Sequence, residues 1–312
     1  MKTTDELIHS YLSDLKAALR GADKATIQDA LADAEEHLRT ALENEVAGNE
    51  GGADGEILQN IIAEYGEPEE IAQAYRSWEA ALPPALADTP AARRADSAKK
   101  SYPGFFGVFA DPRAWGGLVY MLISIITGTL YFSWAVTGLA TSLGVMVLII
   151  GIPVTIIFLL SFRGIAFLEG RLVESLLGER MPRRASFTDS SLPWKERLKA
   201  LLLGKATWLS WIYMILMLPL GVIYFSFMVT FLALGLGLAL TPVGTIVVLA
   251  MGIPLGVVQS GNYIWSLSDP GAVLLSLLFC GLGIFITTGC MHLARWVGKV
   301  HGKFAKALLV SD

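Results

Sequence analysis

Few side chains in this sequence are placed to do chemistry, and His37 is the first of them. It lies in the segment AEEHLRT, directly after Glu35 and Glu36, and phosphoacceptor histidines occupy such acidic helical settings. Phosphotransfer would also need a glycine-rich segment that binds a nucleotide, whereas both later glycine clusters stand in apolar sequence. We therefore interpret His37 as a surface or boundary histidine, and we predict no catalytic residue.

The two cysteines, Cys280 and Cys290, stand ten residues apart in one apolar segment. On a helix this separation is about 15 Å along the axis, which is beyond the reach of a disulfide. No spacing of His, Cys, Asp and Glu matches a metal site, so the sequence predicts no metal and no other cofactor. His292, near the inner end of a predicted span, is expected to contact headgroups or backbone.

Long uncharged stretches indicate helices that cross a membrane. No Asp, Glu, Lys or Arg occurs in the 49 residues between Arg113 and Arg163, the 63 between Lys205 and Asp269, or the 25 between Asp269 and Arg295. About 20 apolar residues are enough to cross a bilayer. The sequence therefore predicts an integral membrane protein from about residue 114 onward.

The charge divides the chain into two parts. Residues 1–90 carry 19 acidic and 6 basic residues, a net charge of −13, whereas residues 91–312 carry 9 acidic and 18 basic residues, a net charge of +9. Four amphipathic runs precede residue 83, so residues 1–82 are expected to fold as a small acidic helical bundle. The polar N-terminus lacks the apolar core of a cleaved signal peptide, and we expect the bundle to stay in the cytoplasm.

The segments YLSDLKAAL, IQDALADAEEHL and IIAEYGEPEEIAQAY resemble the HAAS domain, a helical bacterial signalling domain associated with PadR-type regulators and often fused to membrane segments. The turn and helix start from Tyr65 to Ala72 carry the most specific part of this likeness. The resemblance implies a partner-binding role without an active site. The residues expected to bind the partner are Glu35, Glu36, His37, Tyr65, Glu67, Glu69 and Glu70.

The membrane part, residues 114–312, follows a linker and interfacial segment at 83–113 and has the pattern of a duplication. An offset of 93 residues aligns Trp115 with Trp208 and Gly128 with Gly221, and an offset of 132 aligns Arg163 with Arg295 and Glu169 with His301. Each unit, 114–184 and 205–310, is predicted to be a hairpin of two spans followed by a basic amphipathic helix on the inner leaflet. We expect an all-α fold with the two hairpins as parallel repeats. Glu169 and His301 either pair with each other or are unrelated interfacial side chains.

The change of offset marks an insertion in the second unit, at about residues 241–269. Its sequence leaves open whether residues 236–258 span the membrane or form a re-entrant or extracytoplasmic cap. With four spans all 24 Lys and Arg residues lie inside, so the positive-inside bias favours four spans over five. The residues expected to bind a ligand on the outer side are Gln259, Asn262, Tyr263, Trp265 and Asp269. The residues expected to form a basic inner face are Arg163, Arg171, Arg295, Lys299 and Lys303.

A second resemblance covers roughly residues 105–310. The segments GFFGVFADPRAW, Gly-Ile-Pro at 151–153 and FRGIAFLEGRLVESLLGE resemble the sensor domain that actinobacterial sensor histidine kinases carry at their N-terminus. The resemblance implies a sensory role for the membrane part. In this chain the HAAS-like bundle takes the output position.

These features favour a non-enzymatic membrane sensor that couples a membrane or extracytoplasmic cue, such as a lipid-like ligand, to a cytoplasmic regulator of the PadR-like or response-regulator type. Membrane lipids are expected partners, direct nucleic-acid binding is not expected, and a homo-oligomer stays open. The predicted location is the bacterial cytoplasmic membrane, with several spans and a cytoplasmic N-terminus. The alternatives are a membrane tether or scaffold without a ligand, and a transporter of a small solute or lipid.

Overall fold

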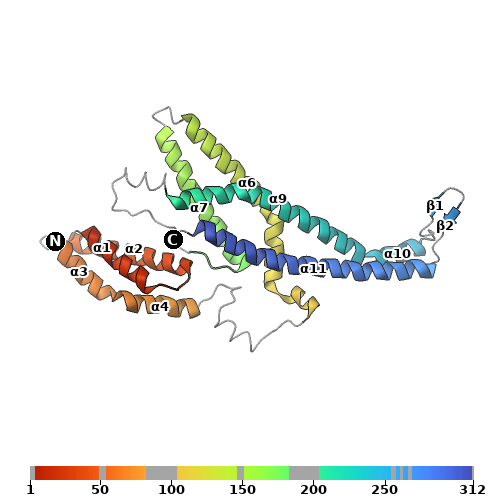
Figure 1. The fold of residues 1–312 in the computed structure, drawn as a ribbon, viewed down its shortest axis with the longest axis horizontal. Helices are drawn as coiled ribbons and strands as arrows, with labels where there is room; N and C mark the ends of the chain where they lie inside the picture. The colour runs from red at the N-terminus through yellow and green to blue at the C-terminus, as the bar shows by residue number, and fades with distance from the viewer. Residues whose placement is uncertain are drawn as a thin grey trace. The chain divides into compact units, whose positions relative to one another are not determined.

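The computed structural model describes residues 4–48, 54–81, 104–145, 151–182, 204–253, 258–260, 263–265 and 269–310. Four helices come first: α1 (Thr4–Ala18), α2 (Lys24–Gly48), α3 (Asp54–Tyr65) and α4 (Pro68–Ala81). The membrane part comprises η1 (Phe105–Ala110), α6 (Pro112–Val145), α7 (Gly151–Leu177), α9 (Lys205–Ala239), α10 (Thr241–Ala250), β1 (Val258–Ser260), β2 (Tyr263–Trp265) and α11 (Asp269–Leu309) (Figure 1). The predicted all-α class is confirmed, with one short antiparallel strand pair as the addition among the described residues.

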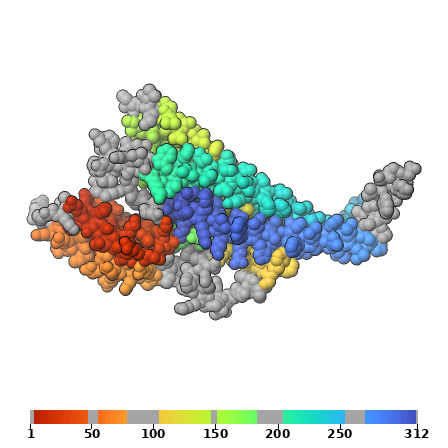
Figure 2. Space-filling view, viewed as in Figure 1, coloured from red at the N-terminus to blue at the C-terminus, as the bar shows by residue number. Residues whose placement is uncertain are grey.

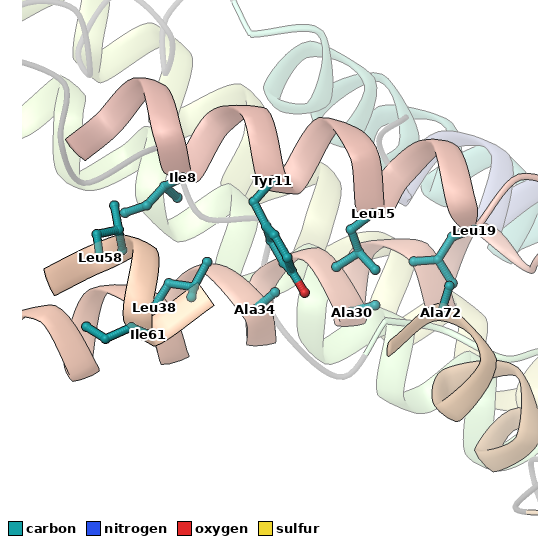
Figure 3. Close-up of a cluster of buried hydrophobic side chains, with 10 residues drawn as sticks. All are labelled: Ile8, Tyr11, Leu15, Leu19, Ala30, Ala34, Leu38, Leu58, Ile61 and Ala72. Atoms are coloured by element: carbon teal, nitrogen blue, oxygen red, sulfur yellow. The ribbon is translucent and has the colours of Figure 1, made fainter. Parts of the chain in front are cut away.

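The helices α1 to α4 pack around one apolar core (Figure 3). Its buried side chains are Ile8, Tyr11, Leu15, Leu19, Ala30, Ala34, Leu38, Leu58, Ile61 and Ala72. Those of α1 recur every three or four residues, which places them on one face of the helix. All four helices contribute to this one core, so the expected small helical bundle is confirmed.

Four helices are long and apolar enough to cross a membrane, as the sequence predicted. These candidate spans are Pro112–Val145, Gly151–Leu177, Lys205–Ala239 and Pro270–Leu309. The apolar helix α10 has only 10 residues, about 15 Å at the helical rise, and therefore cannot provide a fifth span. Whether the inserted segment is a re-entrant element or an extracytoplasmic cap stays a prediction.

The basic segments after two of the spans do not form separate helices, and in this respect the sequence-based expectation was wrong. The helix α7 runs without a break through Arg163 to Leu177, and α11 is one helix of 41 residues that continues through Arg295 to Leu309. No proline follows Pro153 in α7 or Pro270 in α11, so the backbone hydrogen bonds continue past the charged residues. Each basic segment is thus a rigid extension of its span.

The structure divides into two compact units, and the equivalent glycines of the duplication lie in the same one. This unit comprises Tyr102–Leu130 and Met217–Val300. A Cβ atom at Gly128 of α6 would overlap the backbone of Met217, and a Cβ atom at Gly221 of α9 would overlap the backbone of Ser124. Because Ser124 and Met217 are themselves 93 residues apart, the contact is reciprocal, as a twofold relation between the repeats requires. Whether that axis follows the membrane normal stays a prediction.

In the same unit α9 and α11 lie side by side, as Figure 2 also shows. The contact uses small residues, because Gly283 of α11 meets the backbone of Ala239 and Gly235. The Oγ1 of Thr241 donates to the carbonyl of Ser276 at 3.0 Å. Small side chains at such a crossing let two helix backbones approach closely.

At its start α6 is tied to α11. The carboxylate of Asp111 accepts a hydrogen bond from the backbone N–H of Arg113 at 3.0 Å, and it pairs with the Arg295 guanidinium at 3.0 Å. Asp111 therefore caps α6 and joins it to the basic part of α11. As predicted for His292, its Nε2 contacts backbone, lying 2.9 Å from the carbonyl oxygen of Phe105.

Candidate functional site

The most specific segment of the bundle, Tyr65 to Glu70, forms a tight corner between α3 and α4. Gly66 has a φ of 113°, a conformation that favours glycine, and its N–H donates to the carbonyl of Ile62 at 3.2 Å. Glu67 then accepts the first backbone hydrogen bond of α4 through its carbonyl, from Ile71 at 3.1 Å. Pro68 begins that helix, where its missing N–H costs nothing. The corner fixes the direction in which the acidic first turn of α4 points.

The phenol of Tyr11 holds this corner against the core. Its hydroxyl donates to the carbonyl of Gly66 at 2.8 Å, and its ring meets the ring of Tyr65 edge to face at 6.0 Å between centroids. Burial raises the pKa of Tyr11, and the neighbouring Tyr65 and Glu67 add to the effect. The corner therefore depends on a neutral, hydrogen-bonded tyrosine.

Two of the residues predicted to bind a partner, His37 and Tyr65, lie next to each other at the surface of the bundle. The ring of His37 on α2 lies 4.7 Å from the ring of Tyr65, centroid to centroid, with a tilt of 31°. His37 is exposed, Tyr65 is half-buried, and Glu36, Glu67, Glu69 and Glu70 are exposed. We refer to His37, Tyr65 and these four glutamates as the acidic face. It offers negative charge around an accessible aromatic pair, a composition suited to a basic protein partner.

Glu35, the remaining predicted partner-binding residue, has a structural role. Its carboxylate pairs with the Arg39 guanidinium at 3.0 Å, and the same guanidinium reaches Asp5 of α1 at 3.2 Å. The arginine therefore joins α2 to α1 through Asp5, while Glu35 holds the guanidinium from its own helix. Glu35 is half-buried, and we do not include it in the acidic face.

Two features of α4 were missed by sequence reasoning. Trp78 is 69% exposed on the helical bundle, and exposed tryptophans are typical of binding surfaces. Its ring lies 6.5 Å from that of Tyr75, whose hydroxyl donates to Asp33 Oδ2 at 2.6 Å. Burial and this hydrogen bond raise the pKa of Tyr75. Apolar periodicity gave no indication of Trp78, because a single exposed tryptophan fits either face of a short helix.

The residues predicted to bind a ligand fall in the inserted segment, and the structure describes their backbone only in part. Gln259 lies in β1, and Tyr263 and Trp265 lie in β2, with Gln259 opposite Ile264 in the register. Asn262 lies outside the described residues. Asp269 begins α11. A hairpin thus brings three of the five positions onto one pair of strands, and their role in binding remains a prediction.

The predicted basic inner-face residues divide into two groups. Arg295, Lys299 and Lys303 are exposed on α11, and Arg295 pairs with Asp111. Arg171 instead pairs with Glu174 at 2.7 Å and donates to the carbonyl of Pro182, so it closes the C-terminal end of α7. Arg163 donates to the hydroxyl of Thr207 on α9 at 3.4 Å.

A second cluster lies in the unit that comprises Met1–Ser101, Tyr131–Leu216 and His301–Asp312. The carboxylate of Glu169 on α7 accepts hydrogen bonds from Tyr131 of α6 and Tyr213 of α9, each at 2.8 Å. The Tyr213 hydroxyl also lies 3.1 Å from Nε2 of His301 on α11. Glu169 and His301 are therefore not unrelated side chains, because the Tyr213 phenol joins them. We refer to these four residues as the buried relay.

Three members of the buried relay are shielded from solvent, and Tyr131 is half-buried. Glu169, Tyr213 and His301 are each 1% exposed, and the ring of Phe304 lies 5.8 Å from that of Tyr213 and 5.7 Å from that of His301. The sequence predicted spans without charged residues. This prediction is corrected, because the candidate span α7 contains the buried carboxylate of Glu169. The two tyrosines were missed because tyrosine in an apolar segment also fits an interfacial anchor.

The residues that the structure describes hold no group of three or more His, Cys, Asp or Glu side chains that could bind a metal ion. Cys280 and Cys290 are free thiols.

Both parts of the chain match known protein families. Residues 10–74 match the HAAS family, and residues 120–309, more than half of the chain, match the family described as "Putative sensor". Neither the curated proteins nor the solved structures gave a match. The two matches support a signalling or sensor role and, together with the four apolar helices, a location in a membrane. The chain therefore belongs to the sensor family described by that model and carries a HAAS domain before it.

Proposed function

We propose that this protein is a non-enzymatic membrane sensor whose acidic face binds a cytoplasmic regulator under the control of the membrane domain. The observation that carries the proposal is the union of a sensor-family membrane domain with a HAAS domain in one chain. The acidic face supports it, because it combines the adjacent, tilted rings of His37 and Tyr65 with four exposed glutamates. A regulator with a basic, arginine-rich docking surface would complement this arrangement.

The binding step is tested with the full chain in lipid nanodiscs. The probes are two purified regulators from the same organism, one PadR-type and one response regulator. The test variant changes Glu67, Glu69 and Glu70 to Gln. We expect affinity for the true partner to fall about tenfold, since each charge at the rim of an interface contributes about 0.5 kcal/mol.

A matched control removes the same charge from another part of the bundle. Glu43, Glu45 and Glu56 are exposed on α2 and α3, and changing them to Gln lowers the negative charge equally. This control should bind like the wild type. If both triple variants lose affinity to the same extent, attraction to the total charge explains binding, and the acidic face is not the docking site.

The inserted segment is our candidate for the receiving surface. Its hairpin groups Gln259, Tyr263 and Trp265 on two strands, and such polar and aromatic residues suit an amphiphilic, lipid-like ligand. A receiving surface predicts that Trp265→Ala alters regulator binding in the full chain when the lipid composition of the nanodisc is varied. A tether without a ligand predicts that the same substitution has no effect at any lipid composition.

Coupling between the two parts is proposed to use charge at the end of α11. Lys306 Nζ lies 2.7 Å from Asp23 of the bundle and 3.1 Å from Glu179, which follows α7. A ligand that shifts α11 would bias this contact between formed and broken states. Crosslinking of the bundle to the membrane domain should therefore weaken as ionic strength rises, and Lys306→Gln should lower it at low salt. If crosslinking changes neither with ionic strength nor in Lys306→Gln, this form of coupling is ruled out.

A transporter of a small solute or lipid is the weaker candidate. Its support is that prolines interrupt apolar sequence, as Pro219 does inside α9, and that the buried relay places a carboxylate in a candidate span. Uptake or efflux of a solute by vesicles that contain the protein would establish it.

A further inference from the structure

The guanidinium of Arg295 on α11 is held from one side only. Its Nε lies 3.0 Å from Oδ2 of Asp111, and the arginine side chain is still 50% exposed. Asp111 is itself buried and fixed by the backbone N–H of Arg113. A guanidinium carries five N–H donors in a rigid planar fork. The terminal nitrogens of Arg295 are therefore oriented and available to bind two oxygens of a second anion.

Lys299 adds a second cation beside this fork. It follows Arg295 by four residues, so the two side chains are neighbours on one face of the helix. Lys299 is exposed and forms no ion pair with the residues that the structure describes. At the equivalent positions of the first repeat, Arg163 donates to Thr207 and Phe167 replaces the lysine. The exposed pair of cations is thus a feature of the second repeat.

The length of α11 places Arg295 at the level of lipid headgroups. Asp269 begins this helix, and no charged residue stands between it and Arg295. The two residues are 26 positions apart, about 39 Å at the helical rise, and a bilayer with its headgroup layers is about 40–45 Å thick. When α11 spans a bilayer, Asp269 and Arg295 therefore lie in the headgroup layers of opposite leaflets.

Positive charge in this unit is concentrated around Arg295. Within Tyr102–Leu130 and Met217–Val300 the acidic residues are Asp111 and Asp269, and the basic residues are Arg113, Arg295 and Lys299. Asp269 lies at the far end of α11, so the end around Arg295 has three basic residues against one acid, a net charge of +2. An anionic headgroup complements this charge.

An exposed aromatic surface adjoins Arg295 on its apolar side. The ring of Phe105 stacks with those of His292 at 5.4 Å and Phe285 at 5.3 Å, which stand about 5 and 15 Å before Arg295 along the helix. Phe106 meets Phe105 edge to face at 5.4 Å, and Phe106 and Phe285 are 62% and 61% exposed. A phospholipid presents a phosphate and, next to it, acyl chains, so this arrangement suits a lipid better than free phosphate.

The geometry points to a binding site for an anionic phospholipid. The terminal nitrogens of Arg295 and the ammonium group of Lys299 bind its phosphate, and its acyl chains lie along Phe105, Phe106 and Phe285. Asp111 is a positioning residue that holds the guanidinium at Nε. The site lies at the opposite end of α11 from the inserted segment and does not depend on partner binding, so failure of either proposal leaves the other unaffected.

The test is native mass spectrometry of the full chain in detergent, supplied with equal amounts of phosphatidylglycerol and phosphatidylcholine that carry the same acyl chains. Each basic residue near a headgroup layer favours anionic lipid by about fivefold, so two such residues should give the wild type a preference of about 25-fold for phosphatidylglycerol. Arg295→Gln and Lys299→Gln should each lower this preference by about fivefold. The control, Lys205→Gln, removes an exposed lysine at the start of α9 and should keep the preference of the wild type.

Two additions keep the test decisive. Lys299→Gln breaks no ion pair among the described residues, so it serves if Arg295→Gln, which loses Asp111, does not fold. Glycerol phosphate in large excess offers the phosphate without acyl chains and should leave the lipid bound. The proposal is overturned if the wild type shows no preference, if folded Arg295→Gln or Lys299→Gln retains it in full, if Lys205→Gln lowers it as much as Lys299→Gln does, or if glycerol phosphate displaces the lipid.

Discussion

Replacing Tyr11 with Phe removes one hydroxyl from the core of the HAAS domain and should loosen the corner that directs the acidic face. Tyr11 is 5% exposed, and its hydroxyl donates to the carbonyl of Gly66 at 2.8 Å. Loss of a buried hydrogen bond costs about 1–2 kcal/mol. For a domain of this size each kcal/mol lowers Tm by about 4–8 °C, so we expect the Tm of residues 1–82 to decrease by about 4–16 °C.

The same substitution should change how stability depends on pH. Burial raises the pKa of Tyr11 above its ordinary value, so the folded state binds the phenolic proton more tightly than the unfolded chain does. This contribution is fully present below about pH 10, where tyrosine ionises in the unfolded chain, and it is lost as pH rises toward the folded pKa. The wild-type domain should therefore lose stability above about pH 10 more steeply than Tyr11→Phe does.

Thermal and urea unfolding of residues 1–82, followed by circular dichroism at several pH values, measures both effects. Ser77→Ala is the control, because Ser77 is exposed and its hydroxyl donates to the carbonyl of Ala74 within the same helix, α4. The Tm of this variant should change little. If Tyr11→Phe has the Tm of the wild type and the same alkaline profile, the hydroxyl does not hold the corner and the reasoning is refuted.

Three further substitutions test the rest of the fold. Leu38→Ala at a fully buried position should lower the stability of the bundle by about 2–5 kcal/mol in urea unfolding, and a loss below about 1 kcal/mol would contradict the core. Gly128→Leu should lower the thermal stability of the full chain in nanodiscs, because its side chain would overlap the backbone of α9, whereas Gly144→Leu on the same helix meets open space and should not. Asp111→Ala removes both the cap of α6 and the partner of Arg295. It should lower the stability of the full chain by about 1–2 kcal/mol, measured by thermal unfolding in nanodiscs. Asp111→Asn should recover part of this stability, because asparagine can still cap α6.

The sequence predicted the division of the chain, the four spans and the helical bundle, because these depend on composition and periodicity along the chain. Its repeat also identified Gly128 and Gly221 as equivalent, and the structure adds that each glycine meets the other helix. That contact could not be predicted, since glycine in an apolar helix is also compatible with lipid exposure. Which faces of α6 and α9 meet is decided by the packing of all four helices.

The ends of the spans were harder to predict. The sequence predicts separate interfacial helices after the spans, whereas α7 and α11 continue through Arg163 and Arg295. Charge alone does not end a helix; a break requires proline or a cap, and neither stands directly after these arginines. In the inserted segment, the Gly-Asn pair between β1 and β2 is a recognised hairpin sequence, so the hairpin was within reach of sequence reasoning but was missed.

The candidate site was predictable only in part. Three of the four glutamates of the acidic face could be anticipated because Glu67, Glu69 and Glu70 cluster in the sequence around one corner. The buried relay draws one residue from each of four helices, and of its members only Glu169 and His301 align with each other across the repeat. Tyr131 and Tyr213 align instead with Tyr224 and Tyr120, so the repeat does not separate them from these two tyrosines.

The claim that the membrane domain controls the HAAS domain is tested most directly by one comparison of affinities. The regulator that binds the full chain in nanodiscs is titrated against that protein and against residues 1–82 alone, at the same ionic strength. Coupling between two sites in one protein amounts to about 1–3 kcal/mol, so we predict that residues 1–82 bind the regulator at least about fivefold more tightly than the full chain. Equal affinities would contradict control by the membrane domain and leave the chain as a tether.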